Sequence, residues 1–382
     1  MQKKTSLLTL AAFSVCWLFW LLRTVKLMLI INSGFLPDFV GYYQAARSLI
    51  SPEPDFSFIV NQSYGPPFVF ILFLPLAFLA LPEAELAITL INLVSYWLVF
   101  WLVWQLYFKK TRPVFWVILA LMSFSFPLVY SLGMGNPIGL VTLGIYSFWL
   151  FKHKLAKVLP FLAAVWLKIY PVLIVPALWL RKSTKKDGWL ALAGLFLGLG
   201  FSLIALPQAL WTSYVASWQQ ITLNTKKVID FAIYNQSFSS SLARLGLEAK
   251  FLSGPNIAFI FFLTSLLLAY LVLTAKKPGR RQLESVIVLL CFALLIHPFP
   301  WQYYFASLLP WLMVKIVQKK IGFVLAFLLI SLDGNRLAVS GLIKGLLDSS
   351  QFLAALLIFL MITLRPISVY FKSNSTFEVS IS

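Results

Sequence analysis

Long apolar runs separated by short polar segments make up most of the chain. The first run covers residues 6–31 and is interrupted only by Arg23 and Lys26. A helix that crosses a bilayer needs about 20 mostly apolar residues. The pattern predicts an all-α, polytopic membrane protein. Further spans are predicted at residues 84–108, 113–130, 137–151, 188–206, 255–275, 283–297, 301–317, 321–339 and 349–364.

Three segments need a separate interpretation. The run 6–31 is longer than the apolar core of a cleaved signal peptide, so we expect an uncleaved first helix with its N-terminus in the cytoplasm. Residues 67–81 are short and contain Pro75, which favours a re-entrant or interfacial helix. Residues 155–180 are broken by prolines and by Lys168, which predicts two half-spans that meet at a polar tip.

The composition supports this class. Hydrophobic residues make up 60% of the 382 positions and charged residues only 11%, whereas an ordinary soluble protein is about 25% charged. A water-soluble globule is therefore excluded. The chain is expected to form a single integral-membrane domain over residues 1–382.

The net charge of +19 results from 31 basic and 12 acidic side chains. A nucleic-acid partner would account for it, but cytoplasmic loops that obey the positive-inside rule are the favoured explanation, so no nucleic-acid partner is expected. This rule predicts about twelve crossings (eleven to thirteen), with segments 32–66 and 207–254 outside and the tail 366–382 inside. The basic clusters lie at residues 109–112, 152–157, 181–186, 276–281 and 315–320.

Several chemistries are not indicated by any motif. The sequence has no P-loop, no dinucleotide-binding glycine motif after a strand, no zinc-type cluster and no nucleophile elbow. Cys16 and Cys291 lie far apart inside apolar runs, so they predict no disulfide framework. We therefore expect neither a metal nor another cofactor.

Among the few acidic residues, Asp38 has the most distinctive surroundings. It follows Pro37 shortly after the first apolar run, and helical spacing would place it on the same face as Tyr42. A carboxylate close to a substrate can act as a general base. An aspartate at this position can equally cap the start of a short interfacial helix. The local pattern leaves both roles open.

Lys168 is the second candidate, because it interrupts an apolar segment and is followed by Tyr170. An ionisable side chain at membrane depth is costly and is by default a functional candidate. A phosphate or pyrophosphate lipid head would be a natural partner for it. The alternative is that the lysine reaches the membrane interface from a short half-span.

Two further groups of polar and aromatic residues lie in predicted outer segments. Asn235, Gln236 and Arg244 lie near aromatic residues, a composition that suits sugar recognition but also a solvated loop. His297 lies at the outer end of a predicted span, where a proton shuttle, a hydrogen bond to phosphate or a purely structural role is possible. The neighbouring residues Trp301, Gln302 and Tyr303 also fit an aromatic belt at the membrane interface.

Taken in order, these stretches resemble an integral-membrane glycosyltransferase of the GT-C class, in glycosyltransferase family 87. That family includes polyprenyl-phosphate-mannose-dependent mannosyltransferases of bacterial envelopes. The chain has Gly135-Asn136 where many relatives have Gly-Gln, and Tyr303-Tyr304 where relatives often have histidine after the tryptophan. The matching stretches are Asp38-Phe39-Val40-Gly41-Tyr42-Tyr43-Gln44-Ala45-Ala46, Tyr64-Gly65-Pro66-Pro67, Gly135-Asn136, Lys168-Ile169-Tyr170-Pro171, Asn235-Gln236-Ser237 with Arg244, and Pro298-Phe299-Pro300-Trp301-Gln302-Tyr303-Tyr304.

The resemblance implies an inverting sugar transfer, with mannose favoured, from a polyprenyl-phosphate donor to a glycolipid or glycan acceptor. Asp38 would be the general base and Lys168 would hold the donor phosphate, on the outer side of a prokaryotic inner membrane, without an obligatory metal. A transporter or flippase of lipid-linked sugars is the alternative. The expected substrate-binding residues are Tyr42, Tyr43, Tyr64, Asn136, Lys168, Tyr170, Asn235, Gln236, Arg244, His297, Trp301, Gln302 and Tyr303.

Overall fold

The computed structural model describes most of the chain after the first apolar run. The described residues are 36–57, 59, 66–108, 113–123, 125–179, 184–223, 235–246, 253–274, 281–297, 300–318, 320–333 and 339–378. The predicted first helix at 6–31 and the candidate Tyr64 lie outside them. The expected all-α class is confirmed for the described part, where the only strand-like pairing is an isolated antiparallel bridge between Asn235 and Trp301.

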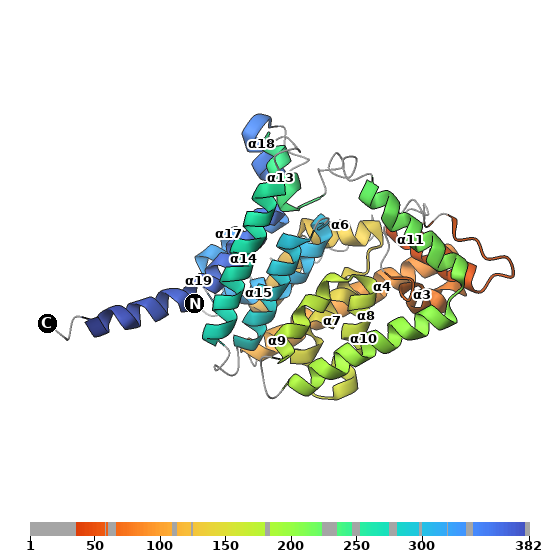
Figure 1. Cartoon of the computed structure of the whole chain (residues 1–382), viewed down its shortest axis with the longest axis horizontal. Helices are drawn as coiled ribbons and strands as arrows, with labels where there is room; N and C mark the ends of the chain where they lie inside the picture. The colour runs from red at the N-terminus through yellow and green to blue at the C-terminus, as the bar shows by residue number, and fades with distance from the viewer. Residues whose placement is uncertain are drawn as a thin grey trace.

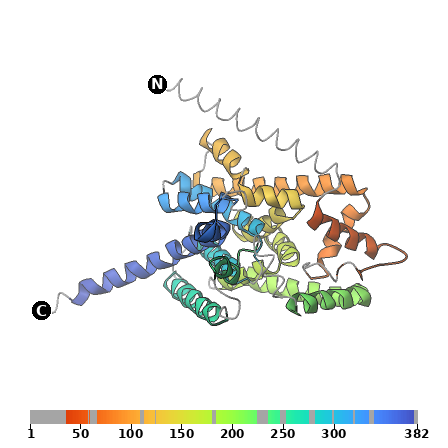
Figure 2. The ribbon, with the colours of Figure 1, turned by 90° about the horizontal axis from the view of Figure 1, so that it is seen from above.

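Helices α2 to α19 and two 3-10 helices, η2 and η4, form the described structure (Figure 1). The C-terminal part of α19 projects from the helical body in both views (Figures 1 and 2). The helices are α2 (Pro37–Leu49), α3 (Val69–Ala77), α4 (Leu81–Phe108), α5 (Pro113–Ser123), α6 (Phe126–Met134), α7 (Ile138–Leu150), α8 (Lys154–Leu167), η2 (Tyr170–Ile174), α9 (Val175–Trp179), α10 (Lys185–Ala205), α11 (Gln208–Leu223), α13 (Phe238–Arg244), α14 (Ser253–Thr274), α15 (Arg281–Ile296), η4 (Gln302–Leu308), α16 (Leu309–Val317), α17 (Ile321–Ser331), α18 (Gly341–Asp348) and α19 (Ser350–Glu378).

Several helices are long and apolar enough to cross a bilayer, which suggests a membrane protein. By length and composition, the described residues contain three such helices, within α4, α10 and α14. The number rises to five if the bent pairs α5–α6 and α18–α19 each form one span. The bends are 54° and 63°, so neither pair is a straight span. The count of about twelve crossings stays a prediction.

Two irregular segments have the local structure that the sequence predicts. Helix α3 is short and separate from α4, and its re-entrant or interfacial placement stays a prediction. Helix α8 ends at Leu167, Lys168 is extended (φ −149°, ψ 121°), and η2 begins at Tyr170. Pro171 lies at the start of η2, where the missing N–H group of proline carries no penalty. The break at Lys168 places its side chain between two helical segments.

The 3-10 helix η4 lies in the interior because other helices bind its backbone. The hydroxyl of Tyr96 in α4 donates to the carbonyl of Ala306 at 2.7 Å, and the hydroxyl of Tyr146 in α7 donates to the carbonyl of Ser307 at 3.0 Å. In an apolar interior such carbonyls need partners. The two tyrosines therefore fix the position of η4, which carries Tyr303 and Tyr304.

Candidate active site

The site is built around the first turn of α2. Pro37 is the first residue of this helix, and Asp38 follows it as the acidic residue of the first turn. The Asp38 side chain is half-buried, and its Oδ2 accepts a hydrogen bond from Nδ2 of Asn136 at 2.9 Å. Two residues 98 positions apart in the sequence are thus brought into direct contact, and both belong to the stretches that carry the family resemblance.

A glycine turn delivers Asn136 to this position. Gly135 ends α6 with a φ of +69°, a backbone conformation that side chains rarely tolerate. A Cβ atom at Gly135 would lie 2.7 Å from the Cβ of Phe39 and 2.8 Å from that of Leu36. Only glycine lets the α6 turn approach the start of α2 this closely. The approach brings Asn136 within hydrogen-bonding distance of Asp38.

The turn is held through the backbone of Asn136 and not through its side chain. Its carbonyl accepts hydrogen bonds from Nδ2 of Asn92 at 2.6 Å and from Oγ of Ser131 at 2.9 Å. Asn92 also accepts a hydrogen bond from the backbone N–H of Gly139 at the start of α7. The amide of Asn136 is therefore free to orient the Asp38 carboxylate. Its buried Oδ1 has no hydrogen-bond partner among the described residues.

Lys168 is buried close to the same helix. Its side chain is 9% exposed, and Nζ lies 3.4 Å from the Tyr42 hydroxyl. The ammonium group also lies 5.8 Å from the ring centroid of Tyr303 and 5.3 Å from that of Tyr304, within range of cation–π attraction. Lys168 forms no ion pair within the described part of the chain. An anion entering this space would find a partly desolvated positive charge.

Tyr42 lies beside the ammonium group and interacts electrostatically with the carboxylate of Asp38. Its ring stacks on Phe73 of α3 at 4.8 Å with an interplanar angle of 16°, which fixes its orientation. Burial, together with the neighbouring Asp38, raises the pKa of Tyr42. The hydroxyl therefore stays protonated at physiological pH and remains a hydrogen-bond donor beside Lys168.

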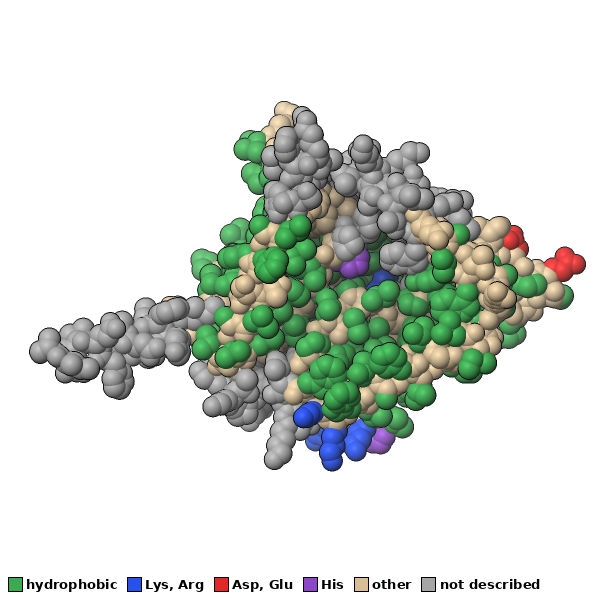
Figure 3. Space-filling model, in the orientation of Figure 1, with side chains coloured by type: hydrophobic (Ala, Val, Ile, Leu, Met, Phe, Trp, Pro, Cys, Tyr) green, Lys and Arg blue, Asp and Glu red, His purple; other side chains and the backbone are tan. Residues whose placement is uncertain are grey.

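Aromatic side chains from η2 and η4 form one wall of the site. The rings of Tyr170 and Tyr304 are 5.1 Å apart, and His297 contacts Tyr304 edge-on at 5.9 Å. Tyr303 interacts electrostatically with Asp38, and its ring lies parallel to that of Trp301 at 6.4 Å. In the space-filling view, a histidine and a basic side chain line a hollow in the middle of one face (Figure 3).

Two other candidates, Tyr43 and Gln302, are buried. The Tyr43 hydroxyl donates to the carbonyl of Leu79 at 2.8 Å and accepts from Nη1 of Arg47 at 2.8 Å. It therefore ties α2 to the segment between α3 and α4. Gln302 is buried at the start of η4.

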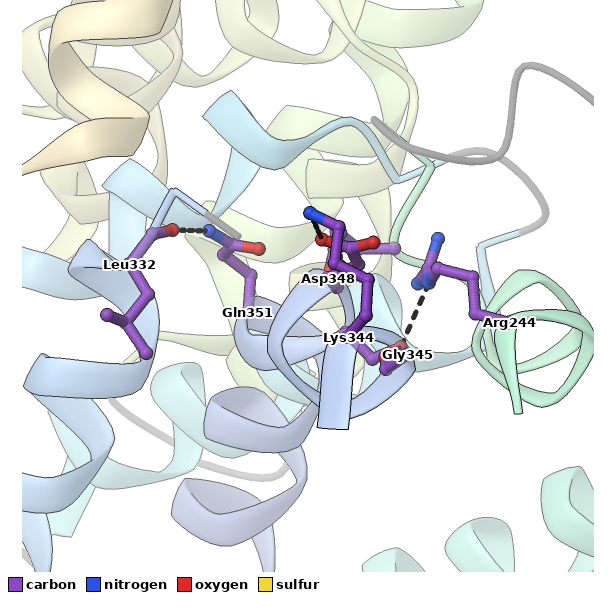
Figure 4. Close-up of polar contacts among 8 residues, drawn as sticks. Arg244, Leu332, Lys344, Gly345, Asp348 and Gln351 are labelled. Carbon is purple, nitrogen blue, oxygen red and sulfur yellow. Dashed lines mark hydrogen bonds and ion pairs between the residues drawn. The ribbon is translucent and has the colours of Figure 1, made fainter. Parts of the chain in front are cut away.

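The 235–244 segment forms a second cluster at the junction of α18 and α19 (Figure 4). Gln236 donates from Nε2 to the carbonyl of Asp348 at 2.6 Å and accepts at Oε1 from the N–H of Phe352 at 3.3 Å. Arg244 donates from Nε to Oγ of Ser349 at 3.0 Å and from Nη1 to the carbonyl of Asn235 at 2.8 Å. These polar groups therefore join helices to each other.

The charge of Arg244 is stabilised only in part by its surroundings. Burial lowers its pKa to about 10, and the nearby carboxylate of Asp348 opposes the effect. Arg244 is thus still cationic at neutral pH. Figure 4 shows Arg244 close to Gly345 and Asp348 of α18. A Cβ atom at Gly345 would lie 2.5 Å from the carbonyl oxygen of Arg244, so the two helices meet at backbone distance.

The sequence interpretation missed a buried carboxylate. Glu85 in α4 is 0% exposed, and its Oε1 accepts a hydrogen bond at 3.3 Å from the backbone N–H of Leu36, immediately before α2. Glu85 therefore holds the start of the helix that carries Asp38. Its only sequence signal is an acidic residue in an apolar run, and its neighbour Glu83 shows the alternative, an acceptor for the N–H of Ala80 at the start of α4.

The described residues contain no group of three histidine, cysteine, aspartate or glutamate side chains able to hold a metal ion. What they do contain is an apolar helical body with a carboxylate, an amide and a buried ammonium group on one aromatic-lined site. This arrangement defines a membrane-type helical protein with a polar site suited to an anionic ligand.

The chain belongs to glycosyltransferase family 87, whose model matches residues 64–298. The family assignment made from the sequence motifs is thus confirmed, and the protein is a glycosyltransferase that acts on a sugar donor and an acceptor. No curated protein and no solved structure matches the chain. Asn136, Lys168 and His297 lie inside the matched region, whereas Asp38 and the rest of α2 precede it.

Proposed function

We propose that the protein transfers a sugar, with mannose favoured, from a polyprenyl-phosphate donor to a glycolipid or glycan acceptor of the cell envelope. The observation that carries this proposal is that the Tyr42 hydroxyl lies 3.4 Å from Nζ of Lys168 and interacts electrostatically with Asp38, in a family 87 chain. A base and an anion-binding cation are the two groups that this reaction needs.

Asp38 is the proposed general base. Its carboxylate takes the proton of the acceptor hydroxyl while the acceptor oxygen attacks the anomeric carbon of the donor. The bond between that carbon and the phosphate oxygen breaks, and the lipid phosphate leaves with the bonding electrons. A single displacement of this kind inverts the anomeric centre. Asn136 orients the carboxylate, with Nδ2 at 2.9 Å from Oδ2.

Lys168 is the proposed phosphate ligand. Negative charge grows on the departing phosphate, and a positive charge in a site shielded from water stabilises it strongly. The buried ammonium group donates to the Tyr42 hydroxyl at 3.4 Å, and both groups carry hydrogens that a phosphate oxygen can accept. Lipid phosphate is already a good leaving group, so the proposed reaction needs no metal or other cofactor.

The proposed site faces outward from a prokaryotic inner membrane. Helix α8 begins beside the basic cluster at 152–157 and ends at Leu167, next to Lys168. Helix α15 begins at Arg281, the last residue of the basic cluster at 276–281, and ends just before His297. Both helices therefore run from a basic segment to the site. Basic segments favour the cytoplasmic side, which supports an outer position for the opposite end.

The experiment is a transfer assay with polyprenyl-phosphate [14C]mannose and membranes that contain the wild-type chain or a variant. We expect Asp38→Asn to abolish transfer, by at least about 100-fold. The replacement amide can still accept the hydrogen bond from Asn136, so the fold is preserved. Asp55→Asn is the matched control, because Asp55 lies in the same outer segment, where its carboxylate accepts from the N–H of Ser57 at 2.8 Å. Retained transfer in Asp38→Asn would overturn the proposal.

A further inference from the structure

A cavity lies at a distance from the proposed active site. Its volume is about 570 Å³, and it is formed by the ends of α14, α15 and α16 together with α17 and α19. Its lining includes Glu284 in the first turn of α15, whereas His297 follows the last turn of the same helix. At 1.5 Å per residue, the two ends of α15 are about 20 Å apart. The cavity is therefore separate from the Asp38 site.

The cavity has more positive than negative charge. Lys315 and Glu284 form an ion pair at 2.6 Å, and the Lys315 ammonium lies 5.1 Å from the ring centroid of Trp311. The charges of Lys315 and Glu284 therefore neutralise each other. Lys320 and Arg365 also line the cavity, are exposed, and form no ion pair within the described ranges. Two positive charges are thus available to a ligand.

The remaining wall of the cavity is apolar. Ile321, Phe323, Met361 and Ile362 contribute to it. Ile321 is 86% exposed, so this wall continues onto the outer surface of an apolar helix. A ligand that fits this surface has an anionic head and a hydrocarbon body. A soluble anion would pair with the two cations but would leave the apolar wall without a partner.

We propose that this cavity binds the phosphate headgroup of an anionic membrane lipid, with Lys320 and Arg365 as the headgroup ligands and the apolar wall against the acyl chains. Basic pockets between helices at the cytoplasmic end of a membrane protein suit such headgroups. Lys315 and Lys320 of the predicted cytoplasmic cluster at 315–320 both line the cavity. The lipid contacts α14, α15 and α19 together and thereby ties these helices to each other.

The test is native mass spectrometry of the purified full-length chain in detergent micelles that contain equal amounts of phosphatidylglycerol and phosphatidylcholine. We expect the wild-type chain to retain phosphatidylglycerol. Lys320→Ala/Arg365→Ala should bind it roughly 30-fold more weakly, because each cation near a membrane surface contributes about a factor of five. Lys320→Arg/Arg365→Lys keeps both charges and should retain the lipid. This second variant guards against a folding defect.

Lys152→Ala/Lys154→Ala is the matched control, because it removes two exposed cations of another predicted cytoplasmic segment. It should bind phosphatidylglycerol like the wild-type chain. Equal retention of phosphatidylcholine, equal loss in the control variant, or displacement of the lipid by millimolar glycerol 3-phosphate would each overturn the proposal. The last result would show a site for a soluble phosphate.

Discussion

The hydrogen bond between Asn136 and Asp38 allows the proposed base to be perturbed without a change in shape. Asn136→Asp replaces the amide donor with a carboxylate of nearly the same size. The turn itself is held by the backbone carbonyl of residue 136, which Asn92 and Ser131 bind. We therefore expect the variant to fold like the wild-type chain.

The magnitude follows from the distance of 2.9 Å between Nδ2 of Asn136 and Oδ2 of Asp38. Two negative charges at this distance repel by about 1.4 kcal/mol in water and by about 6 kcal/mol at an effective dielectric constant of about 20. Division of this repulsion by 1.36 kcal/mol per pH unit predicts that the acid limb of the activity moves upward by roughly one to four pH units. The carboxylate pair then shares a proton up to a higher pH, so the base is protonated where the wild-type base is not.

The assay is the pH dependence of kcat/KM for sugar transfer. The acid limb of Asn136→Asp should lie about one to four pH units above that of the wild-type chain, and activity should recover as the pH rises. Asn256→Asp is the matched control, because the Asn256 amide donates to Oγ of Ser239 at 2.7 Å in another part of the molecule. An unchanged acid limb in Asn136→Asp would refute the view that Asn136 orients the base.

Three further substitutions separate binding from stability. Lys168→Met should lower kcat/KM for the lipid-phosphate donor about 10- to 100-fold in steady-state kinetics, because a charge-assisted contact contributes about 1.5–3 kcal/mol; an unchanged kcat/KM would exclude the phosphate role. Gly135→Ala should destabilise the chain by about 1–3 kcal/mol in thermal unfolding, because it is strained at positive φ and crowds Phe39; unaltered stability would contradict the close approach. Arg244→Ala should cost about 1.5–3 kcal/mol through loss of the contact with Ser349, whereas a raised KM with normal stability would place Arg244 in the substrate site.

The sequence predicts the helical class and the local breaks of the chain well. Within the described residues the apolar runs fall in helices, and the break expected within 155–180 occurs at Lys168. The reason is that hydrophobic length and proline position are local properties of the chain. The bends between helices are harder to predict from the sequence. The apolar run at 113–130 contains a 54° bend between α5 and α6 that its hydropathy does not indicate.

In the site, too, some features can be predicted from the sequence and others depend on tertiary packing. Ordered motifs predict that Asp38, Asn136 and Lys168 belong together, and the structure places Asn136 against Asp38 and Lys168 against Tyr42. Glu85 was missed because its contact with the N–H of Leu36 depends on how α2 packs against α4, 49 residues away in the sequence. Such a contact has no local signature.

For amide and guanidinium side chains, the sequence does not distinguish a sugar-binding role from a structural one. Gln236 and Arg244 have the composition of a sugar-binding loop, yet both donate hydrogen bonds to residues at the junction of α18 and α19. Polar side chains beside aromatic rings serve equally well to join helices and to bind hydroxyls. Their role is therefore decided by tertiary contacts.

The most direct measurement is a cryo-EM structure of the Asp38→Asn variant with polyprenyl-phosphate mannose bound. We expect a phosphate oxygen about 3 Å from Nζ of Lys168, with the anomeric carbon facing residue 38 across a space that admits an acceptor hydroxyl. A donor phosphate bound by Lys320 and Arg365, or a sugar beyond the reach of residue 38, would contradict it.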